Sequence, residues 1–322
     1  MNTSIIGLGR IAFSLETDPK RYKPCTHLGA LKTFHRTEYT IQGLCDLNSE
    51  KCENAARFLN CGSVFTSQNF VEILSRNPEL LLILTSTESH FEILQMAMDM
   101  QIPRIVVEKP VCLTKKEANN LMRIRKKSKS KVWVNYERQY HKKYKLLKKM
   151  IQTATELGPP LYYNATMLCP GKNLTPFEKD EGILLHDTTH MVDLACFLFG
   201  PAKDFRKENV FKNNKKSILH LNHSSIAGKI LTIAESKNFL FEMEIFFEKG
   251  RVRTGNGYSL IEKSAESPYY SGFYSYQKPE FYQDNIPEQE DNPFRKLYED
   301  VLFGNPPENM FENACENVKI LS

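Results

Sequence analysis

The chain lacks the features that mark secreted, membrane-spanning and nucleic-acid-binding proteins. Its eight cysteines form no CxxC pair and no spacing typical of a disulfide scaffold, so we expect reduced thiols. No apolar run approaches the roughly 20 residues that span a bilayer, and the N-terminus has no basic segment followed by a long apolar one. We therefore expect a cytoplasmic protein with no membrane partner.

The net charge is also small, at +5 over 322 residues. Much of the positive charge falls in two clusters, residues 123–131 and 142–149. Such clusters are typical of solvated helix faces, and the alternative is a stripe that binds polyanions. No nucleic-acid-binding motif accompanies them, so we expect no nucleic-acid partner, although a basic rim could steer a phosphorylated substrate.

The length favours two domains, and we place the boundary after residue 136. Over residues 1–136, short apolar runs alternate with helical patterns, and the last helix begins with a capping box of Thr114 and Glu117. The predicted strands are 3–6, 39–45, 80–85, 105–108 and 132–135, and the predicted helices are 50–59, 69–76, 91–100 and 115–126. This alternation predicts an α/β domain with a doubly wound parallel sheet of the Rossmann type.

The pattern changes over residues 137–322. Helices are predicted at 142–156, 187–199, 294–302 and 310–321, and strands at 218–220, 230–235, 240–247 and 251–253. Residues 268–293 are rich in Tyr, Pro and Gln, which predicts a long irregular segment. We expect an α+β domain with a large, mostly antiparallel open sheet.

The string GLGRIA follows the first predicted strand. Gly7 permits a tight turn, Gly9 lets backbone N–H groups approach a pyrophosphate, and Ala12 allows close packing of helix and strand. The next helix start would add a positive dipole and further N–H donors. We expect Gly7, Gly9, Arg10 and Ile11 to contact a dinucleotide.

Asp46 ends the second predicted strand, 37 residues after Gly9 rather than the ~20 expected. We attribute the excess to an inserted loop at residues 13–24, with the helix resuming near Thr26. Asp46 would accept a hydrogen bond from the ribose 2′-OH and repel a 2′-phosphate, which favours NAD, with NADP possible. The alternative for Asp46 is a turn residue that begins Asp-Leu-Asn-Ser.

Two further strands end in polar residues, where doubly wound sheets place their ligands. After the fourth strand come Thr85, Thr87 and His90, which would lie under the cofactor, although His90 could equally be a helix residue with no ligand. After the fifth come Glu108 and Lys109, with Lys109 as candidate proton donor or acceptor. The alternative for Lys109 is a surface residue in a turn.

The string HDTTH opens a second-domain helix. Residues three or four apart share a helix face, so Asp187 or His186 can lie beside His190 and fix its tautomer. One alternative is that these are polar residues at a helix start that only form hydrogen bonds with one another. Another is a metal site at His186 and His190, but no nearby Cys/His cluster completes it, so we expect no metal.

These motifs, in this order, resemble the Gfo/Idh/MocA oxidoreductases, the group of glucose–fructose oxidoreductase and inositol dehydrogenase. The resemblance rests on GLGRIA, Asp46, residues 85–90, EKP, residues 134–138 and the helix that contains HMVDLACFLFG. It implies a Rossmann domain followed by a substrate-binding domain whose open sheet builds homodimers or homotetramers. It also implies that Lys109 acts in proton transfer and substrate binding with His190 as its partner, and that Asn135 and Arg138 lie near the nicotinamide or substrate.

The chain departs from this family at two places. The family usually has Asp four residues before the helix histidine, whereas here that position is His186 and the acid is Asp187. One residue along a helix rotates a side chain by roughly 100°, so either Asp187 orients His190 from another side or His186 takes the aspartate's role. The insertion at residues 13–24 is the second departure.

The sequence therefore predicts an NAD-dependent enzyme that moves a hydride between nicotinamide and the hydroxyl or keto carbon of a sugar, cyclitol or nucleotide sugar. Lys109, aided by His190, would exchange the hydroxyl proton, while His186, Asp187 and Arg138 hold the substrate. Two alternatives stay open. One is a glycoside-cleaving enzyme that recycles tightly held NAD, and the other is a non-enzymatic dinucleotide sensor on the same fold.

Overall fold

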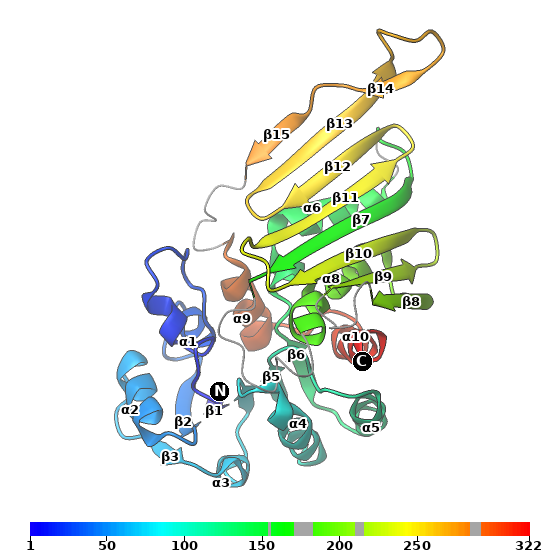
Figure 1. Ribbon diagram of the computed structural model, residues 1–322. Coiled ribbons are helices and arrows are strands. Elements are labelled where there is room, and N and C mark those ends of the chain that lie inside the picture. The colour runs from blue at the N-terminus through cyan, green and yellow to red at the C-terminus, as the bar shows by residue number, and fades with distance from the viewer. Residues whose placement is uncertain (154–155, 171–182, 210–215, 284–290) are drawn as a thin grey trace. The chain divides into compact units, whose positions relative to one another are not determined.

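The computed structural model describes residues 1–153, 156–170, 183–209, 216–283 and 291–322 (Figure 1). Two compact units make up the chain. The first comprises Met1–His141 with Pro287–Ile320 and Ser322, and the second comprises Lys142–Ile286 with Leu321. The C-terminal helices thus cluster with the first unit, whereas the sequence placed them in the second domain.

The first unit is built on a six-stranded sheet of order β3-β2-β1-β4-β5-β6 in which every pair of neighbours is parallel. The order reverses between β1 and β4, which confirms the predicted Rossmann topology. The carboxyl ends of all strands meet at one edge of the sheet. The strands are β1 (Asn2–Ile6), β2 (Thr40–Cys45), β3 (Phe65–Ser67), β4 (Leu80–Ile83), β5 (Arg104–Val107) and β6 (Lys131–Val134).

Helices flank this sheet, and the predicted capping box at Thr114 and Glu117 is confirmed at the start of α5. The helix after the insertion begins at His27 with Thr26 as its N-cap, as the sequence predicted. The helices are α1 (His27–Leu31), α2 (Ser49–Phe58), α3 (Phe70–Leu74), α4 (His90–Asp99), α5 (Lys115–Arg125), α9 (Pro293–Phe303) and α10 (Met310–Leu321), with short 3-10 helices η1 (Ser14–Thr17), η2 (Thr87–Ser89) and η3 (Glu137–Tyr140).

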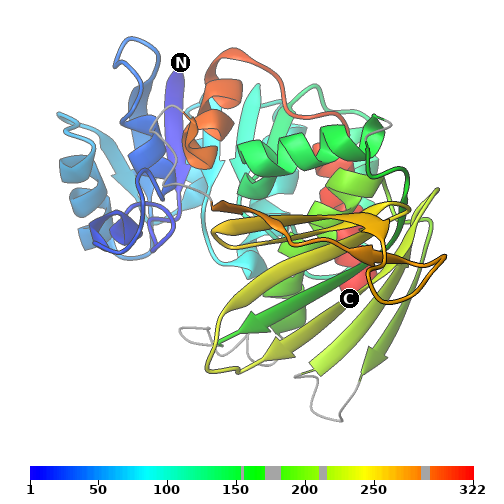
Figure 2. The same cartoon turned by 90° about the horizontal axis from the view of Figure 1, so that it is seen from above.

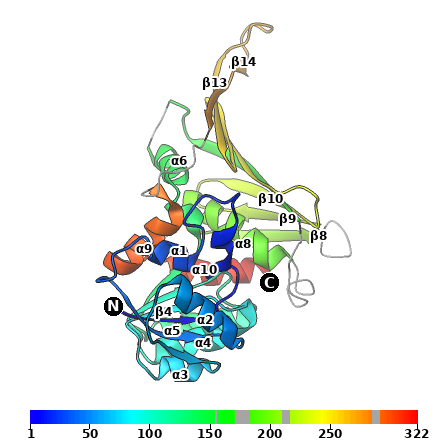
Figure 3. The ribbon, with the colours of Figure 1, turned by 90° about the vertical axis from the view of Figure 1, so that its left-hand side faces the viewer.

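The two C-terminal helices join the first unit through their apolar faces. Leu297 and Val301 of α9 are fully buried, and α9 packs beside α1 (Figure 3) and against η3. On α10, the sulfur of Met310 accepts a hydrogen bond from the N–H of Val134 at 3.4 Å. These contacts join segments too far apart in sequence for periodicity to reveal.

The second unit holds a nine-stranded sheet in which only the β7–β10 pair is parallel. The predicted irregular segment is wrong in part, because β14 and β15 lie within it and pair with β13. The strands are β7 (Pro160–Cys169), β8 (Asp204–Asn209), β9 (Lys216–Asn222), β10 (Ala227–Ala234), β11 (Leu240–Phe247), β12 (Gly250–Gly255), β13 (Tyr258–Glu266), β14 (Tyr274–Tyr276) and β15 (Glu280–Gln283).

Helices α6 (Lys142–Gln152) and α8 (Ile183–Phe199) lie on the same side of this sheet (Figure 2). Alternate residues of β11, including Phe241, Met243 and Ile245, are buried, as expected for a sheet with helices on one face. Residues 154–155 of the predicted helix 142–156 lie outside the described residues. Among the residues that are described, no helix is both long and apolar enough to cross a bilayer.

Candidate active site

The glycine turn after β1 has the geometry that a dinucleotide requires. Gly7 has a φ of +89°, and a Cβ there would lie 2.5 Å from the backbone of Leu84 and Thr85, so a side chain is excluded. A Cβ on Gly9 would meet no atom within 4 Å, which leaves its backbone open to close approach. Ala12 is fully buried. The three positions fit their predicted roles in a pyrophosphate-binding turn.

A pocket of about 660 Å³ opens beside this turn, at the carboxyl ends of β1, β2 and β4. It occupies the edge where the strand order reverses, which is where open α/β sheets bind their ligands. The residues that line it are Ile6, Gly7, Gly9, Cys45, Asp46, Leu47, Asn48, Lys51, Gln68, Phe70, Leu84, Thr85, Ser86, Ser89 and Ile93. Gly7, Gly9, Asp46 and Thr85 were predicted from the sequence, whereas Lys51 and Phe70 were not.

Asp46 both closes the glycine turn and faces this pocket. Its Oδ2 accepts a hydrogen bond from the N–H of Leu8 at 2.8 Å, and its Oδ1 accepts one from the N–H of Asn48 at 3.0 Å. The ammonium of Lys51 lies 3.4 Å from Oδ1. Asp46 therefore does act as a turn residue. Because a carboxylate has about four acceptor sites, Asp46 can still accept a hydrogen bond from a ribose hydroxyl.

The N-terminus of α1 differs from the expected phosphate site. The Glu16 carboxylate accepts hydrogen bonds from the Thr26 hydroxyl at 2.7 Å and the Cys25 N–H at 3.1 Å. A Cβ on Gly29 would collide with that carboxylate. The chain's own anion thus sits at the start of this five-residue helix. The sequence analysis expected additional N–H donors for a ligand at this helix start, but those of His27 and Leu28 donate to the carbonyls of Ile11 and Ala12.

The loop after β4 is held by hydroxyl groups and by His90. Ser89 donates its hydroxyl hydrogen to Thr85 at 2.7 Å, and Thr87 is buried but does not line the pocket. The nitrogens of His90 lie 2.8 Å from the Pro110 carbonyl and 3.0 Å from the Thr85 carbonyl. Burial lowers the pKa of His90, and both of its ring nitrogens lie against backbone carbonyls rather than facing the pocket. These contacts favour the alternative in which His90 binds no ligand and instead links the ends of β4 and β5.

Glu108 lies in a buried network that the sequence did not reveal. His27, which has no exposed surface, places Nε2 2.7 Å from Glu108 Oε1 and Nδ1 2.7 Å from the Tyr298 hydroxyl. The Asn135 side-chain N–H₂ donates to the same carboxylate oxygen at 2.6 Å, and the Lys109 N–H donates to the other at 3.2 Å. The network joins the carboxyl ends of β5 and β6 to α1 and α9.

The network keeps Glu108 ionised. Burial acts to raise the pKa of Glu108, but the hydrogen bond and charge of His27, with Lys109 and Asn135, outweigh it and lower the pKa to about 2. Because an ionised carboxylate only accepts, His27 must present an N–H at Nε2 and Asn135 must present its N–H₂.

The orientation of Asn135 leaves a polar atom for a ligand. Its Oδ1 is buried and has no hydrogen-bond partner among the described residues. A buried acceptor of this kind ordinarily has a donor, and the carboxamide N–H₂ of nicotinamide would supply one. The glycine turn and the pocket at Asp46 therefore fit a dinucleotide, and the unpartnered Asn135 Oδ1 is an acceptor that suits a nicotinamide carboxamide.

Lys109 occupies a turn that is fixed on both sides. Its own N–H is bound by Glu108, and the next carbonyl, that of Pro110, is bound by His90. The residue is half-buried at the carboxyl end of β5. Arg138, in η3, pairs with Glu137 at 2.7 Å. The first unit thus presents Lys109 from a backbone that is hydrogen-bonded before and after it.

The HDTTH residues lie in the second unit, inside α8 rather than at its start, because the helix begins at Ile183. His186 Nδ1 lies 3.0 Å from Asp187 Oδ1, so the acid pairs with the histidine beside it. His190 is half-buried one turn later. The described residues contain no group of three or more His, Cys, Asp or Glu side chains that could hold a metal ion.

Comparison with known proteins supports this assignment of the first unit. Residues 1–136 match a family model described as "Oxidoreductase family, NAD-binding Rossmann fold". The resemblance predicted from the motifs is confirmed over that range, and NAD is the cofactor of the matching fold. No curated protein matches the chain.

Solved structures match nearly the whole chain in fold. Levoglucosan dehydrogenase in complex with NADH and levoglucosan has a TM-score of 0.77 at 15% identity, covering 99% of this chain and 95% of that one. A dehydrogenase from Chromobacterium violaceum has a TM-score of 0.75 at 16% identity, covering 100% and 93%. An oxidoreductase from Agrobacterium radiobacter in complex with NAD+, L-tartaric acid and magnesium has a TM-score of 0.71 at 13% identity, covering 100% and 94%. These likenesses show that the chain has the two-part fold of such dehydrogenases.

Proposed function

We propose that the chain, whose residues 1–136 match the family model of the Gfo/Idh/MocA NAD-binding oxidoreductases, is an NAD-dependent dehydrogenase of sugars, cyclitols or nucleotide sugars. The observation that carries the proposal is the Lys109 turn. Lys109 follows β5 and Asn135 follows β6, so both residues belong to the carboxyl edge of the sheet that also carries the glycine turn.

Each residue of the first unit has a role in this proposal. Gly7 and Gly9 admit the pyrophosphate, and Asp46 binds the ribose hydroxyls, which favours NAD over NADP. Asn135 accepts a hydrogen bond from the carboxamide and orients the ring. When bound, NAD supplies a hydride acceptor at its pyridine ring. Lys109, as the neutral amine, takes the proton of the substrate hydroxyl as a general base and becomes the ammonium, a role that typically contributes about 10²–10⁴-fold to the rate.

The residues of α8 act on the substrate in this proposal. His190 assists Lys109 in proton transfer, while Asp187, paired with His186, and Arg138 bind neighbouring hydroxyls. Polar groups of this kind suit a polyol, since each desolvated hydroxyl needs a partner. The structural neighbours include a levoglucosan dehydrogenase, captured with levoglucosan and NADH. That likeness supports a carbohydrate substrate class for this chain.

The test is a panel of polyols, sugars and nucleotide sugars with NAD or NADP, followed at the absorbance band of reduced nicotinamide. Lys109→Ala should lower turnover by about 10²-fold or more and leave NAD binding intact. Lys109→Arg keeps the positive charge, but an arginine side chain does not give up a proton at neutral pH. This variant should therefore lose turnover as well. Lys116→Ala, which removes an exposed ammonium from α5, is the matched control.

Three results would count against the proposal. Full turnover in Lys109→Ala would remove this residue from proton transfer. Cleavage of glycosides with no net reduction of NAD would favour the cofactor-recycling alternative. NAD binding without turnover of any substrate would favour the sensor.

A further inference from the structure

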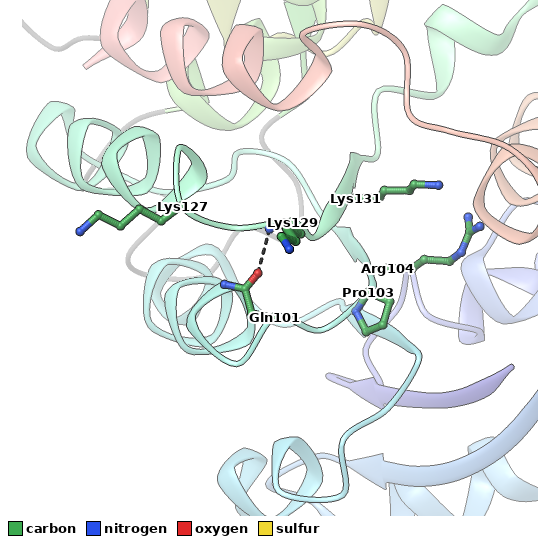
Figure 4. Close-up of a pocket in the computed structure, with 6 residues that line it drawn as sticks. All are labelled: Gln101, Pro103, Arg104, Lys127, Lys129 and Lys131. Carbon is green, nitrogen blue, oxygen red and sulfur yellow. Dashed lines mark hydrogen bonds between the residues drawn. The ribbon is translucent and has the colours of Figure 1, made fainter.

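A second hollow in the first unit lies at the edge of the sheet opposite the glycine turn. It measures about 660 Å³, and Gln101, Pro103, Arg104, Lys127, Lys129 and Lys131 line it (Figure 4). Arg104 is the first residue of β5 and Lys131 the first of β6, whereas Glu108 and Asn135 follow the last residues of the same strands. The two hollows share no lining residue.

The cations of this hollow stand on a fixed framework. Arg104 and Lys131 are paired in register on adjacent parallel strands, and Figure 4 shows their side chains extending in the same direction. The Arg104 guanidinium donates to the carbonyls of Val301 at 2.8 Å and Gly304 at 3.2 Å, which fixes its position.

The loop that carries the lysines is also tied down. The N–H of Lys129 donates to the Gln101 side chain at 2.8 Å, as Figure 4 shows. The Ser128 hydroxyl bonds to the Met98 carbonyl at 3.2 Å, and Arg125 donates to the Ser130 carbonyl at 2.7 Å. A ligand that bound here would therefore order little backbone, which lowers the entropic cost of binding.

The charge of the hollow is unbalanced. Four of the six lining side chains are cationic and none is acidic, and no carboxylate of the described residues pairs with those four. The carboxyl ends of α4, α5 and α9 lie here, and each counts as about half a negative charge. They offset about 1.5 charges and leave a surplus of about 2.5.

We propose that this hollow is a binding site for a small diphosphate-bearing ligand, separate from the dinucleotide pocket. A phosphate monoester carries a charge of about −1.5 to −2 at neutral pH. A diphosphate carries more negative charge, which is closer to the positive surplus of the hollow. Arg104 supplies a planar fork for phosphate oxygens, and Lys129 and Lys131 supply ammonium donors. The volume leaves space for an attached sugar or nucleoside. Lys127 extends away from Arg104 and Lys131 in Figure 4 and forms the rim.

The test is calorimetric titration of the full chain with inorganic diphosphate and with a nucleoside diphosphate, at constant ionic strength and with saturating NAD to occupy the glycine turn. We expect saturable binding that Lys129→Gln with Lys131→Gln weakens roughly tenfold or more, because two charged donors are lost. Arg104 is left intact because it also caps α9. The matched control is Lys20→Gln with Lys116→Gln, which removes two exposed charges of the same unit.

Each arm separates the proposal from an alternative. Stronger binding of the nucleoside diphosphate than of diphosphate alone would show that the hollow also receives the attached group. Equal weakening in the control pair, or the same heat from potassium chloride at matched ionic strength, would reduce the site to an adventitious ion only. Tighter binding of a thymidine oligomer, with strong salt dependence, would overturn it in favour of a nucleic-acid surface.

Discussion

Glu108 shows how a buried charge is tolerated beside the proposed catalytic lysine. An isolated carboxylate in an apolar interior is costly, but Glu108 has donors on both oxygens, from His27, Asn135 and the Lys109 backbone. Removing one hydrogen-bond partner of such a carboxylate lowers the stability of the fold by more than the energy of that hydrogen bond, because the charge stays buried without it. The network therefore fixes the Lys109 turn through a single side chain.

The lowered pKa of Glu108 predicts acid sensitivity. The folded-state pKa, at about 2, lies below the ordinary 4.5, so the stabilisation is complete above the ordinary value and is lost as pH falls from about 4.5 through about 2. The amount is on the order of 3 kcal/mol. Melting temperature measured against pH should fall steeply in this window for the native chain and less steeply for Glu108→Gln. Glu92→Gln, at an exposed position on α4, should keep the native slope; a native slope in Glu108→Gln would contradict this account.

Some of the candidate site residues were predicted from the sequence because they follow a predicted strand. Asp46 and Lys109 each follow a strand of the parallel sheet, and the topology alone brings strand ends to one edge, whereas Asn135 was implied only by the family resemblance. His27 and Tyr298 have no such mark. Their partners are 81 and 271 residues away in the chain, and only the packing of α1 and α9 brings them together.

At the level of elements, the short helix α1 depends on the inserted loop. Five residues are too few for an independently stable helix, so its position rests on Thr26 as N-cap and on Glu16, which binds Thr26 and Cys25. Because His27 is the first residue of α1, Glu16 indirectly positions the ring that bonds to Glu108. The insertion is thus a structural part of the site.

Glu16→Ala should loosen that element. Loss of the cap partner should cost on the order of 1–2 kcal/mol and speed amide hydrogen exchange over residues 13–31. It should also weaken turnover through His27 more than it weakens NAD binding, because the pocket at Asp46 does not include Glu16. Glu92→Ala, which removes an exposed carboxylate elsewhere in the unit, is the control. Unchanged exchange in Glu16→Ala would show that the loop is held by other contacts.

Three of the strands that were missed from the sequence, β7, β14 and β15, lack a strong apolar pattern. In β7 the buried positions include Ala165 and Cys169, whose small side chains weaken the apolar alternation by which strands are recognised. In β14 and β15 the described aromatic residues, such as Tyr274 and Phe281, are exposed, so no buried face marks these strands. Strand β11, with large apolar residues on one face, was predicted with its observed bounds.

At the scale of the whole molecule, the first unit is discontinuous in sequence. The family match ends at residue 136, yet Tyr298 completes the network at Glu108 and Met310 bonds to β6. The sequence alone assigned α9 and α10 to the second domain because chain order was the only guide. Their buried residues instead contribute to the stability of the proposed cofactor-binding unit.

This arrangement predicts which unit a distant core substitution weakens. Leu297 on α9 is fully buried, so Leu297→Ala should cost about 2–5 kcal/mol through lost contacts and a cavity. Hydrogen exchange should then rise across residues 1–141, with NAD affinity falling in parallel, while the strands of the second unit, such as β7, β10 and β11, stay protected. Phe303→Ala removes a side chain that is 58% exposed at the end of the same helix and should change little. If exchange rose only in residues 142–286, the C-terminal helices would belong energetically to the second unit, and the discontinuous first unit would be wrong.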